Sequence, residues 1–165
     1  MPSTPPPTLI YLGLGSNLDD RLRNLREAQA ALPPQVQVLR ASRVYETAPW
    51  GYSDQPAYLN QVLEARTALA PLELLAHLKA IEARLGRVPS FRFGPRLIDI
   101  DILFYDDRII ELPGVTIPHP RLHERAFVLV PLADITPDLL HPVLGRTIRA
   151  LLDEVDKNGI TPWTV

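Results

Sequence analysis

The chain has 165 residues, 46% of them hydrophobic and 22% charged, a length that suits one packed domain and is short for two. With a net charge of −2, it lacks the basic field with which non-specific nucleic-acid binders hold phosphate backbones. The absence of cysteine excludes disulfides, thiolate zinc sites and a cysteine nucleophile, and no apolar run approaches the roughly 20 residues that cross a bilayer. We therefore expect a cytoplasmic protein that binds neither nucleic acid nor membranes, and we expect a monomer.

The N-terminal region is predicted to contain a lead and a first strand. Residues 1–8 are rich in proline, so we expect a flexible lead, followed by a single domain over residues 9–165. The apolar stretch TLIYLGL ends at two glycines, Gly13 and Gly15. This pattern predicts a buried strand that enters a tight turn.

Two helices are indicated by apolar stripes with helical spacing. The first should have Asp19 and Asp20 in its first turn and a double proline after its end, and its apolar face comprises Leu22, Leu25, Ala28 and Leu32. The second should begin at Pro71 and end just before Gly86, and its stripe comprises Leu74, Leu75, Leu78, Ile81 and Leu85.

The remaining elements of the core are strands. Alternating apolar positions in residues 36–47 and 58–67 predict two strands joined by a turn-rich loop. After the second helix comes a basic loop, residues 87–96, and then the sequence LIDIDILFY, which alternates with period two. The order strand, helix, strand, strand, helix, strand predicts an α+β fold with a ferredoxin-like βαββαβ core, in which helices cover one face of an antiparallel sheet.

The C-terminal part, residues 109–165, shows weaker signals and no internal repeat. It is expected to contain a short hairpin, a loop around His119, a helical turn near Phe127 and a terminal helix over residues 148–155.

The strongest signal for chemistry is the pair Asp99 and Asp101 inside a predicted strand. Alternate strand residues point the same way, so both carboxylates should share one face while the other is taken by Ile98, Ile100, Ile102 and Phe104. Magnesium commonly binds through one or two carboxylates together with substrate phosphates, so a metal–phosphate site is the functional interpretation. The alternative is an edge strand with two solvated aspartates.

The basic loop before this pair contains Arg87, Arg92 and Arg96. Arginines can neutralise transferring phosphoryl oxygens while carboxylates hold metal ions, which is the division of labour in phosphoryl transfer. A solvated loop whose arginines pair with surface acids is the alternative. The familiar phosphate-binding motifs are absent, since Leu18 replaces the third glycine of a dinucleotide fingerprint and no GxxxxGK[ST] occurs. ATP bound here would be held by arginines and metal.

Histidines carry weaker signals. His119, in the turn-like IPHPR, could donate to a phosphate, although a solvated loop histidine is the alternative, and His77 and His141 are expected to be structural. His119 and His123 have HxxxH spacing, but without a third ligand or a helical HExxH context we reject a zinc site.

Taken together, the motifs GLGSNL, GPRLIDIDIL and IPHPRLHERAFVL resemble those of the 6-hydroxymethyl-7,8-dihydropterin pyrophosphokinases, over roughly Leu9 to Leu140. The resemblance implies a ferredoxin-like fold and a role in folate biosynthesis. It also implies transfer of the β,γ-diphosphate of ATP to the hydroxymethyl group of the pterin, with release of AMP. The expected cofactor is Mg²⁺, as two ions, and ATP is the co-substrate.

The resemblance also assigns roles to residues. The metal-binding and catalytic aspartates correspond to Asp99 and Asp101, and the catalytic arginines to Arg87 and Arg96. The pterin-binding residues implied are Thr47, Trp50, Tyr58, Asn60, Phe93 and Phe127. The ATP-binding residues implied are Leu75, Lys79, Glu82, Arg92, Ile102, Thr116, His119 and Arg125. An amide that reads the edge of a flat pterin and aromatic rings that stack on its faces make physical sense of this set.

Some positions depart from the family pattern. Phe93 stands where some members have tryptophan, Lys79 where glutamine is usual, and Pro89 lies in a basic loop that is one residue shorter. These changes bear on nucleotide contacts and loop movement and leave the reaction unchanged.

Two other functions fit parts of the pattern. Gly15-Ser16 followed by an acidic strand resembles a nucleotidyltransferase, which would release pyrophosphate, but here a strand pair and two helices separate the two motifs. The second is a ferredoxin-like module that binds a small ligand or a partner without catalysis. In such a module the arginines and the paired aspartates would have no catalytic role.

Overall fold

The computed structural model describes residues 6–48, 54–86 and 97–164. In chain order its elements are β1 (Thr8–Ser16), α1 (Arg21–Ala31), β2 (Val36–Ala41), β3 (Tyr45–Thr47), β4 (Tyr58–Thr67), α2 (Pro71–Arg84), β5 (Asp99–Tyr105), β6 (Ile110–Leu112), β7 (Val115–Ile117), a 3₁₀ turn (Leu122–Glu124), α3 (Ala126–Ile135), α4 (Ile148–Asp153) and β8 (Ile160–Pro162).

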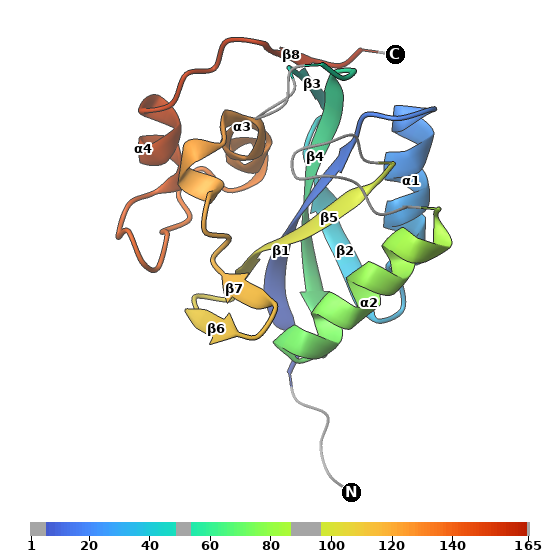
Figure 1. Cartoon of the computed structure of the whole chain (residues 1–165). Coiled ribbons are helices and arrows are strands. Elements are labelled where there is room, and N and C mark those ends of the chain that lie inside the picture. The colour runs from blue at the N-terminus through green and yellow to red at the C-terminus, as the bar shows by residue number, and fades with distance from the viewer. Residues whose placement is uncertain (1–5, 49–53, 87–96, 165) are drawn as a thin grey trace, which may run out of the picture.

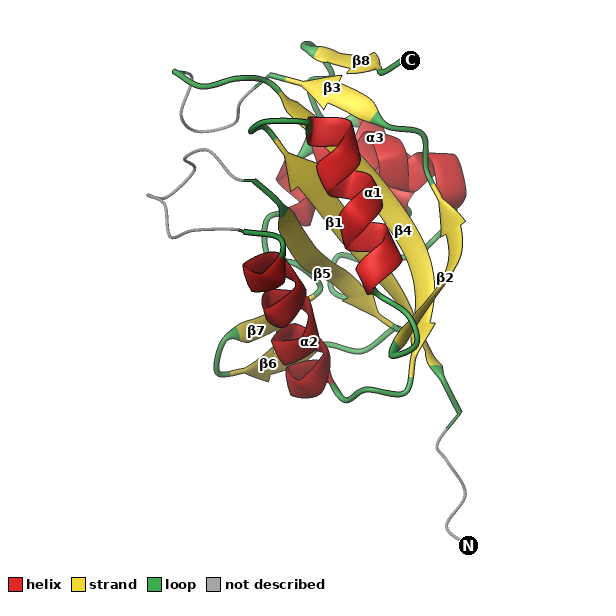
Figure 2. Ribbon diagram, turned by 90° about the vertical axis from the view of Figure 1, so that its right-hand side faces the viewer, coloured by secondary structure: helices red, strands yellow, loops and turns green. Residues whose placement is uncertain are grey.

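The main sheet is antiparallel, with strand order β5-β1-β4-β3-β8, and β2 also pairs with β4. Helices α1 and α2 cover one face, while α3 and α4 cover the other (Figure 1). The β6-β7 hairpin forms a separate small sheet beside α2 (Figure 2). The predicted ferredoxin-like core is therefore confirmed, and the C-terminal helices add a third layer. Every described helix is too short or too polar to span a bilayer.

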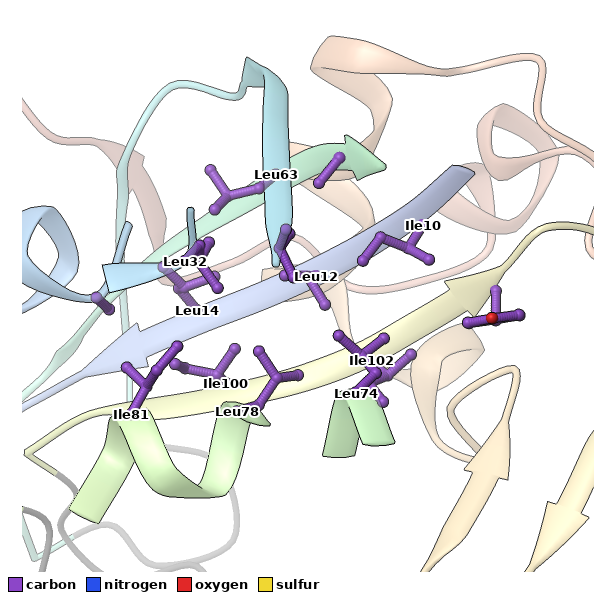
Figure 3. Close-up of a cluster of buried hydrophobic side chains, with 14 of the residues drawn as sticks. Ile10, Leu12, Leu14, Leu32, Leu63, Leu74, Leu78, Ile81, Ile100 and Ile102 are labelled. Carbon is purple, nitrogen blue, oxygen red and sulfur yellow. The ribbon is translucent and has the colours of Figure 1, made fainter. Parts of the chain in front are cut away.

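The core between the sheet and helices α1 and α2 is built from the predicted apolar stripes. Leu12 of β1, Leu74 and Leu78 of α2 and Ile100 of β5 are all at most 2% exposed and lie together (Figure 3). Full burial of such side chains contributes about 2 kcal/mol each. This layer fixes the orientation of β5, because Ile100 and Ile102 face α2 and the residues between them face the other way.

The prediction that Phe104 shares the face of Ile100 and Ile102 is wrong. Ile102 pairs with Leu12 of β1, whereas Phe104 pairs with the adjacent residue, Tyr11, so Leu103 is an extra residue in a β-bulge. The bulge turns Phe104 to the α3 face, where its ring packs edge-on against that of Tyr11 with centroids 6.1 Å apart.

The single strand predicted over residues 36–47 is two strands, β2 and β3. Ala41 pairs with Leu63 but Tyr45 pairs with Asn60, so the β2-β3 segment has one residue more than β4. The break lies at Ser42, whose hydroxyl accepts a hydrogen bond of 2.9 Å from the backbone N–H of Val62. A side chain thus takes the place of a backbone partner, which is how serine commonly interrupts a ladder.

Helix α1 begins two residues later than predicted, so Asp19 and Asp20 precede its first turn. Asp20 is the N-cap and its carboxylate accepts from the backbone N–H of Arg23 at 3.2 Å, while Asp19 has a positive φ of 57°. We expect Asp20→Ala to lower the free energy of unfolding by about 1 kcal/mol, measured by urea denaturation, because the N-cap bond is lost. Asp19→Asn is the matched control and should change stability by less than about 0.5 kcal/mol, since asparagine tolerates a positive φ.

The C-terminal region is more regular than predicted. The helical turn expected near Phe127 is the ten-residue helix α3, which contains Pro131. The hairpin and the terminal helix α4 are confirmed, and β8 is an additional strand that pairs with β3.

Candidate active site

Several of the predicted site residues lie on the sheet face that α3 covers, near the end of β1 that leads into α1. Residues directly opposite in antiparallel strands point to the same face. Asp101 lies opposite Gly13, Asp99 lies opposite Gly15, and Gly15 lies opposite Asn60 on its other side. One row across three strands therefore reads Asp99, Gly15, Asn60. At Gly15 an added Cβ would lie 3.0 Å from Nδ2 of Asn60 and 3.5 Å from Cδ1 of Tyr58, so the row has no room for a side chain there.

Asp99 and Asp101 share this face, as their spacing predicts, and both are partly exposed. Loss of hydration, with the negative charge of Asp99 second, raises the pKa of the Asp101 carboxyl to about 7. A cation between the two carboxylates would lower this pKa again, because it favours the ionised form. Among residues 6–48, 54–86 and 97–164, no cluster of three or more histidine, cysteine or acidic side chains is arranged to hold a metal. Two carboxylates fit magnesium that is completed by phosphates and water.

Glu82 of α2 lies directly behind the aspartate pair. It is 2% exposed, and its Oε2 accepts a hydrogen bond of 2.8 Å from the backbone N–H of Ile100, the residue between the two aspartates. Its Oε1 lies 3.3 Å from Nζ of Lys79. The structure therefore shows that Glu82 contacts the β5 backbone. For Glu82 and Lys79, a contact with ATP stays a prediction.

The loop after β7 brings His119 and Arg125 to the aspartates. The His119 backbone N–H donates to the Leu103 carbonyl at 3.1 Å, and its Nδ1 accepts from the Arg121 N–H at 3.2 Å, which leaves the ring proton on Nε2. Burial, with the positive charge of Arg125 second, lowers the pKa of His119 to about 4. His119 is thus a neutral hydrogen-bond donor at neutral pH. Burial lowers the pKa of Arg125, while the negative charge of Asp101 opposes that shift.

The candidate pterin residues form the other half of the site. Thr47 and Asn60, 3% and 8% exposed, are joined by a 2.6 Å hydrogen bond from the threonine hydroxyl to Oδ1 of Asn60. This bond fixes the amide, whose Nδ2 is turned toward Gly15. Tyr58 lies two residues before Asn60 on the same face, and α3, which carries Phe127, covers that face (Figure 1). The Arg125 guanidinium lies 5.5 Å from the centre of the Phe127 ring.

Three other predicted ATP residues lie away from this face. Leu75 and Ile102 belong to the core beside α2, where Ile102 points away from the aspartates, and Thr116 is exposed on β7. The β6-β7 hairpin reaches α2 near Leu75, since a Cβ on Gly114 would lie 3.7 Å from its Cδ2. The predicted site residues that fall outside the described ranges are Trp50, Arg87, Arg92, Phe93 and Arg96.

Sequence reasoning missed the parts that Gly13, Gly15 and Arg121 play in this geometry. The sequence pattern predicts only a strand end and a tight turn for the two glycines, and their alternate spacing is the signal that they share a face. Arg121 gave no signal of its own, because its contribution to His119 comes from a backbone N–H.

Comparisons with known proteins identify the family. The pyrophosphokinases named 2-amino-4-hydroxy-6-hydroxymethyldihydropteridine pyrophosphokinase from Aquifex aeolicus and Methylorubrum extorquens are 41% and 44% identical to this chain. Each alignment covers 93% of this chain, and 94% and 97% of the relative. The folic acid synthesis protein fol1 of Pneumocystis carinii is 43% identical over 154 residues, and the aligned part is 21% of that longer protein.

The fold also matches solved structures. Wild-type HPPK-DHPS of Plasmodium falciparum superposes with a TM-score of 0.70 over 90% of this chain and 41% of that one, at 20% identity. That likeness concerns the fold alone. The model of the 7,8-dihydro-6-hydroxymethylpterin-pyrophosphokinase family matches residues 11–137, and with the two bacterial relatives aligned almost end to end, this chain belongs to that family.

Proposed function

We propose that this pyrophosphokinase of folate biosynthesis transfers the β,γ-diphosphate of ATP to the hydroxymethyl oxygen of 6-hydroxymethyl-7,8-dihydropterin. The oxygen forms a bond to the β-phosphorus, the bond from that phosphorus to the α-phosphate oxygen breaks, and AMP leaves. Family membership supports the reaction. The observation that carries it is the row from Asp99 across Gly15 to Asn60, which spans two strand spacings, roughly 10 Å.

The two ends of this row suit the two substrates. Asn60, oriented by Thr47, would read the donor and acceptor edge of the pterin, while Tyr58 and Phe127 would stack on its faces. The reacting hydroxymethyl group would then lie over Gly15, toward the aspartates. This placement supplies orientation, which accounts for a large part of the rate in a reaction between two bound substrates.

The phosphate end depends on charge. Asp99 and Asp101 would hold magnesium, two ions in our proposal, which supplies positive charge to the transferring phosphates. Arg125 and the neutral His119 would donate to phosphate oxygens from the opposite loop. Arg87 and Arg96 are proposed to act on the transition state, by analogy with the family's arginines.

The test is to mix the protein with Mg-ATP and 6-hydroxymethyl-7,8-dihydropterin and to follow AMP, omitting each substrate in turn. AMP that forms only with both substrates supports the proposal. Pyrophosphate in place of AMP would indicate the nucleotidyltransferase, and the absence of any turnover would indicate a binding module. We also propose that residues 9–165 act as one domain, in the cytoplasm and as a monomer, and size-exclusion chromatography tests the last point.

The bond between Thr47 and Asn60 gives a separate prediction. Thr47→Val keeps the shape of the side chain and removes the hydroxyl that orients the Asn60 amide. We expect the KM for the pterin to rise about tenfold, the cost of one well-placed hydrogen bond, with the KM for ATP unchanged. Thr47→Ser keeps the hydroxyl and should remain close to wild type, and equal losses in both variants would contradict the assigned role.

A further inference from the structure

The C-terminal strand β8 lies outside the part of the chain that the family model matches, yet it borders the candidate pterin site. It pairs with β3 at the edge of the sheet, with Ile160 opposite Thr47 and Pro162 opposite Tyr45. Thr47 is therefore held between β4 on one side and β8 on the other. Without β8, the three-residue strand β3 would form the sheet edge itself.

Backbone hydrogen bonds extend this contact beyond both ends of β3. The Ala48 N–H donates to the Gly159 carbonyl at 3.1 Å, and the Trp163 N–H donates to the Val44 carbonyl at 2.9 Å. Gly159 has a φ of 81°, and a Cβ there would lie 3.3 Å from Cβ of Ala48. A glycine is thus required at the point where the C-terminal chain meets the residue after Thr47.

The side chain of Trp163 ties β8 to the rest of the domain. The guanidinium of Arg21, at the start of α1, lies 4.9 Å from the centre of the tryptophan ring. The same group donates to the Glu46 carboxylate at 2.8 Å and to the Ala57 carbonyl at 2.9 Å. Arg21 therefore connects β8 both to β3 and to the residue that precedes Tyr58.

We propose that β8, anchored by Trp163 and Gly159, is a positioning element for the pterin site. It holds β3 in register, and β3 in turn keeps the Thr47 hydroxyl on the Asn60 amide. This inference rests on the proposed function. It adds that the last residues of the chain determine pterin affinity without touching the substrate.

The strand order makes the inference specific. β8 lies at one edge of the sheet and β5, with the aspartates, lies at the other, with β3, β4 and β1 between them. A change confined to β8 should therefore displace Thr47 and Asn60 more than the candidate ATP residues. A general loss of stability would show no such preference for one substrate.

The experiment measures the KM for each substrate in the full-length protein, by AMP formation, for Trp163→Ala, Trp163→Phe and Gly159→Ala. We expect Trp163→Ala and Gly159→Ala to raise the KM for the pterin about tenfold, as when one orienting hydrogen bond is lost, with the KM for ATP changed less than twofold. Trp163→Phe should recover most of the pterin affinity, because the ring can still contact Arg21. Val38→Ala is the control, since Val38 of β2 packs on the same core as Trp163 but pairs with Ala65, away from β3, and it should alter neither KM.

Failure of each idea gives a different result. Wild-type protein that forms no AMP with both substrates would overturn the proposed function. Wild-type activity combined with an unchanged pterin KM in Trp163→Ala, or with pterin and ATP KM values that rise together, would overturn only the role of β8. If Trp163→Ala fails to fold, Gly159→Ala decides by the same criteria.

Discussion

Asp99→Ala should reduce kcat by at least about 10³, with the protein still folded. The side chain projects from β5 onto a face shared with Asp101, and a single carboxylate would leave the phosphate charge poorly neutralised in the transition state. Loss of one electrostatic group in such a site costs about 10² to 10³ in kcat, and loss of a metal ligand should lie at or above the upper end. Steady-state AMP formation at saturating Mg-ATP and pterin measures the effect, and circular dichroism checks the fold.

The matched control is Asp106→Asn, which removes an exposed acid just after the other end of the same strand. Its backbone has a positive φ of 53°, which asparagine tolerates, so wild-type kcat is expected. If Asp106→Asn lowered kcat as much as Asp99→Ala, net negative charge rather than a specific site would explain the loss.

A stability measurement distinguishes a functional pair of acids from a structural one. Burial and the charge of Asp99 both disfavour an ionised Asp101 in the folded protein. Asp101→Asn removes that repulsion, so we expect its Tm, measured without magnesium, to be at or above that of wild type. With Mg-ATP and the pterin, we expect a large loss of kcat. A lower Tm in Asp101→Asn would indicate that the carboxylate supports the fold.

The sequence predicted those parts of the structure that local patterns determine. Period-two alternation placed Asp99 and Asp101 on one face, and Pro71 and Gly86 marked the ends of α2. The order of the elements was sufficient for the ferredoxin-like core, because few arrangements of this order bury both helices on one sheet.

Features that depend on contacts between distant segments could not be predicted in this way. The alternation in LIDIDILFY continues through Phe104, and the bulge at Leu103 follows from pairing with β1. Ser42 ends a strand through a bond to Val62, and β8 is three residues long with a proline, so it has no strand signal apart from its partner β3. Pro131 lies inside α3 and weakens the helical signal in the sequence. The helix is stabilised by its packing on the sheet.

The row that joins the two halves of the site is likewise a property of register. Gly15 is an ordinary strand residue in the sequence, and only its pairing with Asp99 on one side and Asn60 on the other gives it a part in the site. Gly13, two residues earlier on the same face, lies opposite Asp101. The two glycines differ in their surroundings, and this difference allows a controlled test.

Gly15→Ala should lower kcat/KM for the pterin by about 10². The added Cβ would lie 3.0 Å from Nδ2 of Asn60 and 3.5 Å from Cδ1 of Tyr58, so both candidate pterin contacts would have to move. Asn60 cannot yield freely, because its Oδ1 is held at 2.6 Å by the buried Thr47 hydroxyl. Displacements approaching 1 Å in a site that orients two substrates can cost about 10² in rate.

Gly13→Ala is the matched control, because it makes the same change on the same strand face. Its Cβ would meet only the Leu103 side chain, with Cδ2 at 3.3 Å, and a small shift of that apolar side chain relieves the contact, so kcat/KM should stay within about threefold of wild type. Both variants remove a strand glycine, so any gain in β-propensity is shared and cancels in the comparison. A Gly15→Ala protein with wild-type kcat/KM would show that the pterin does not lie over this row, and the pairing of Asp99 with Asn60 across Gly15 would then have no part in the transfer.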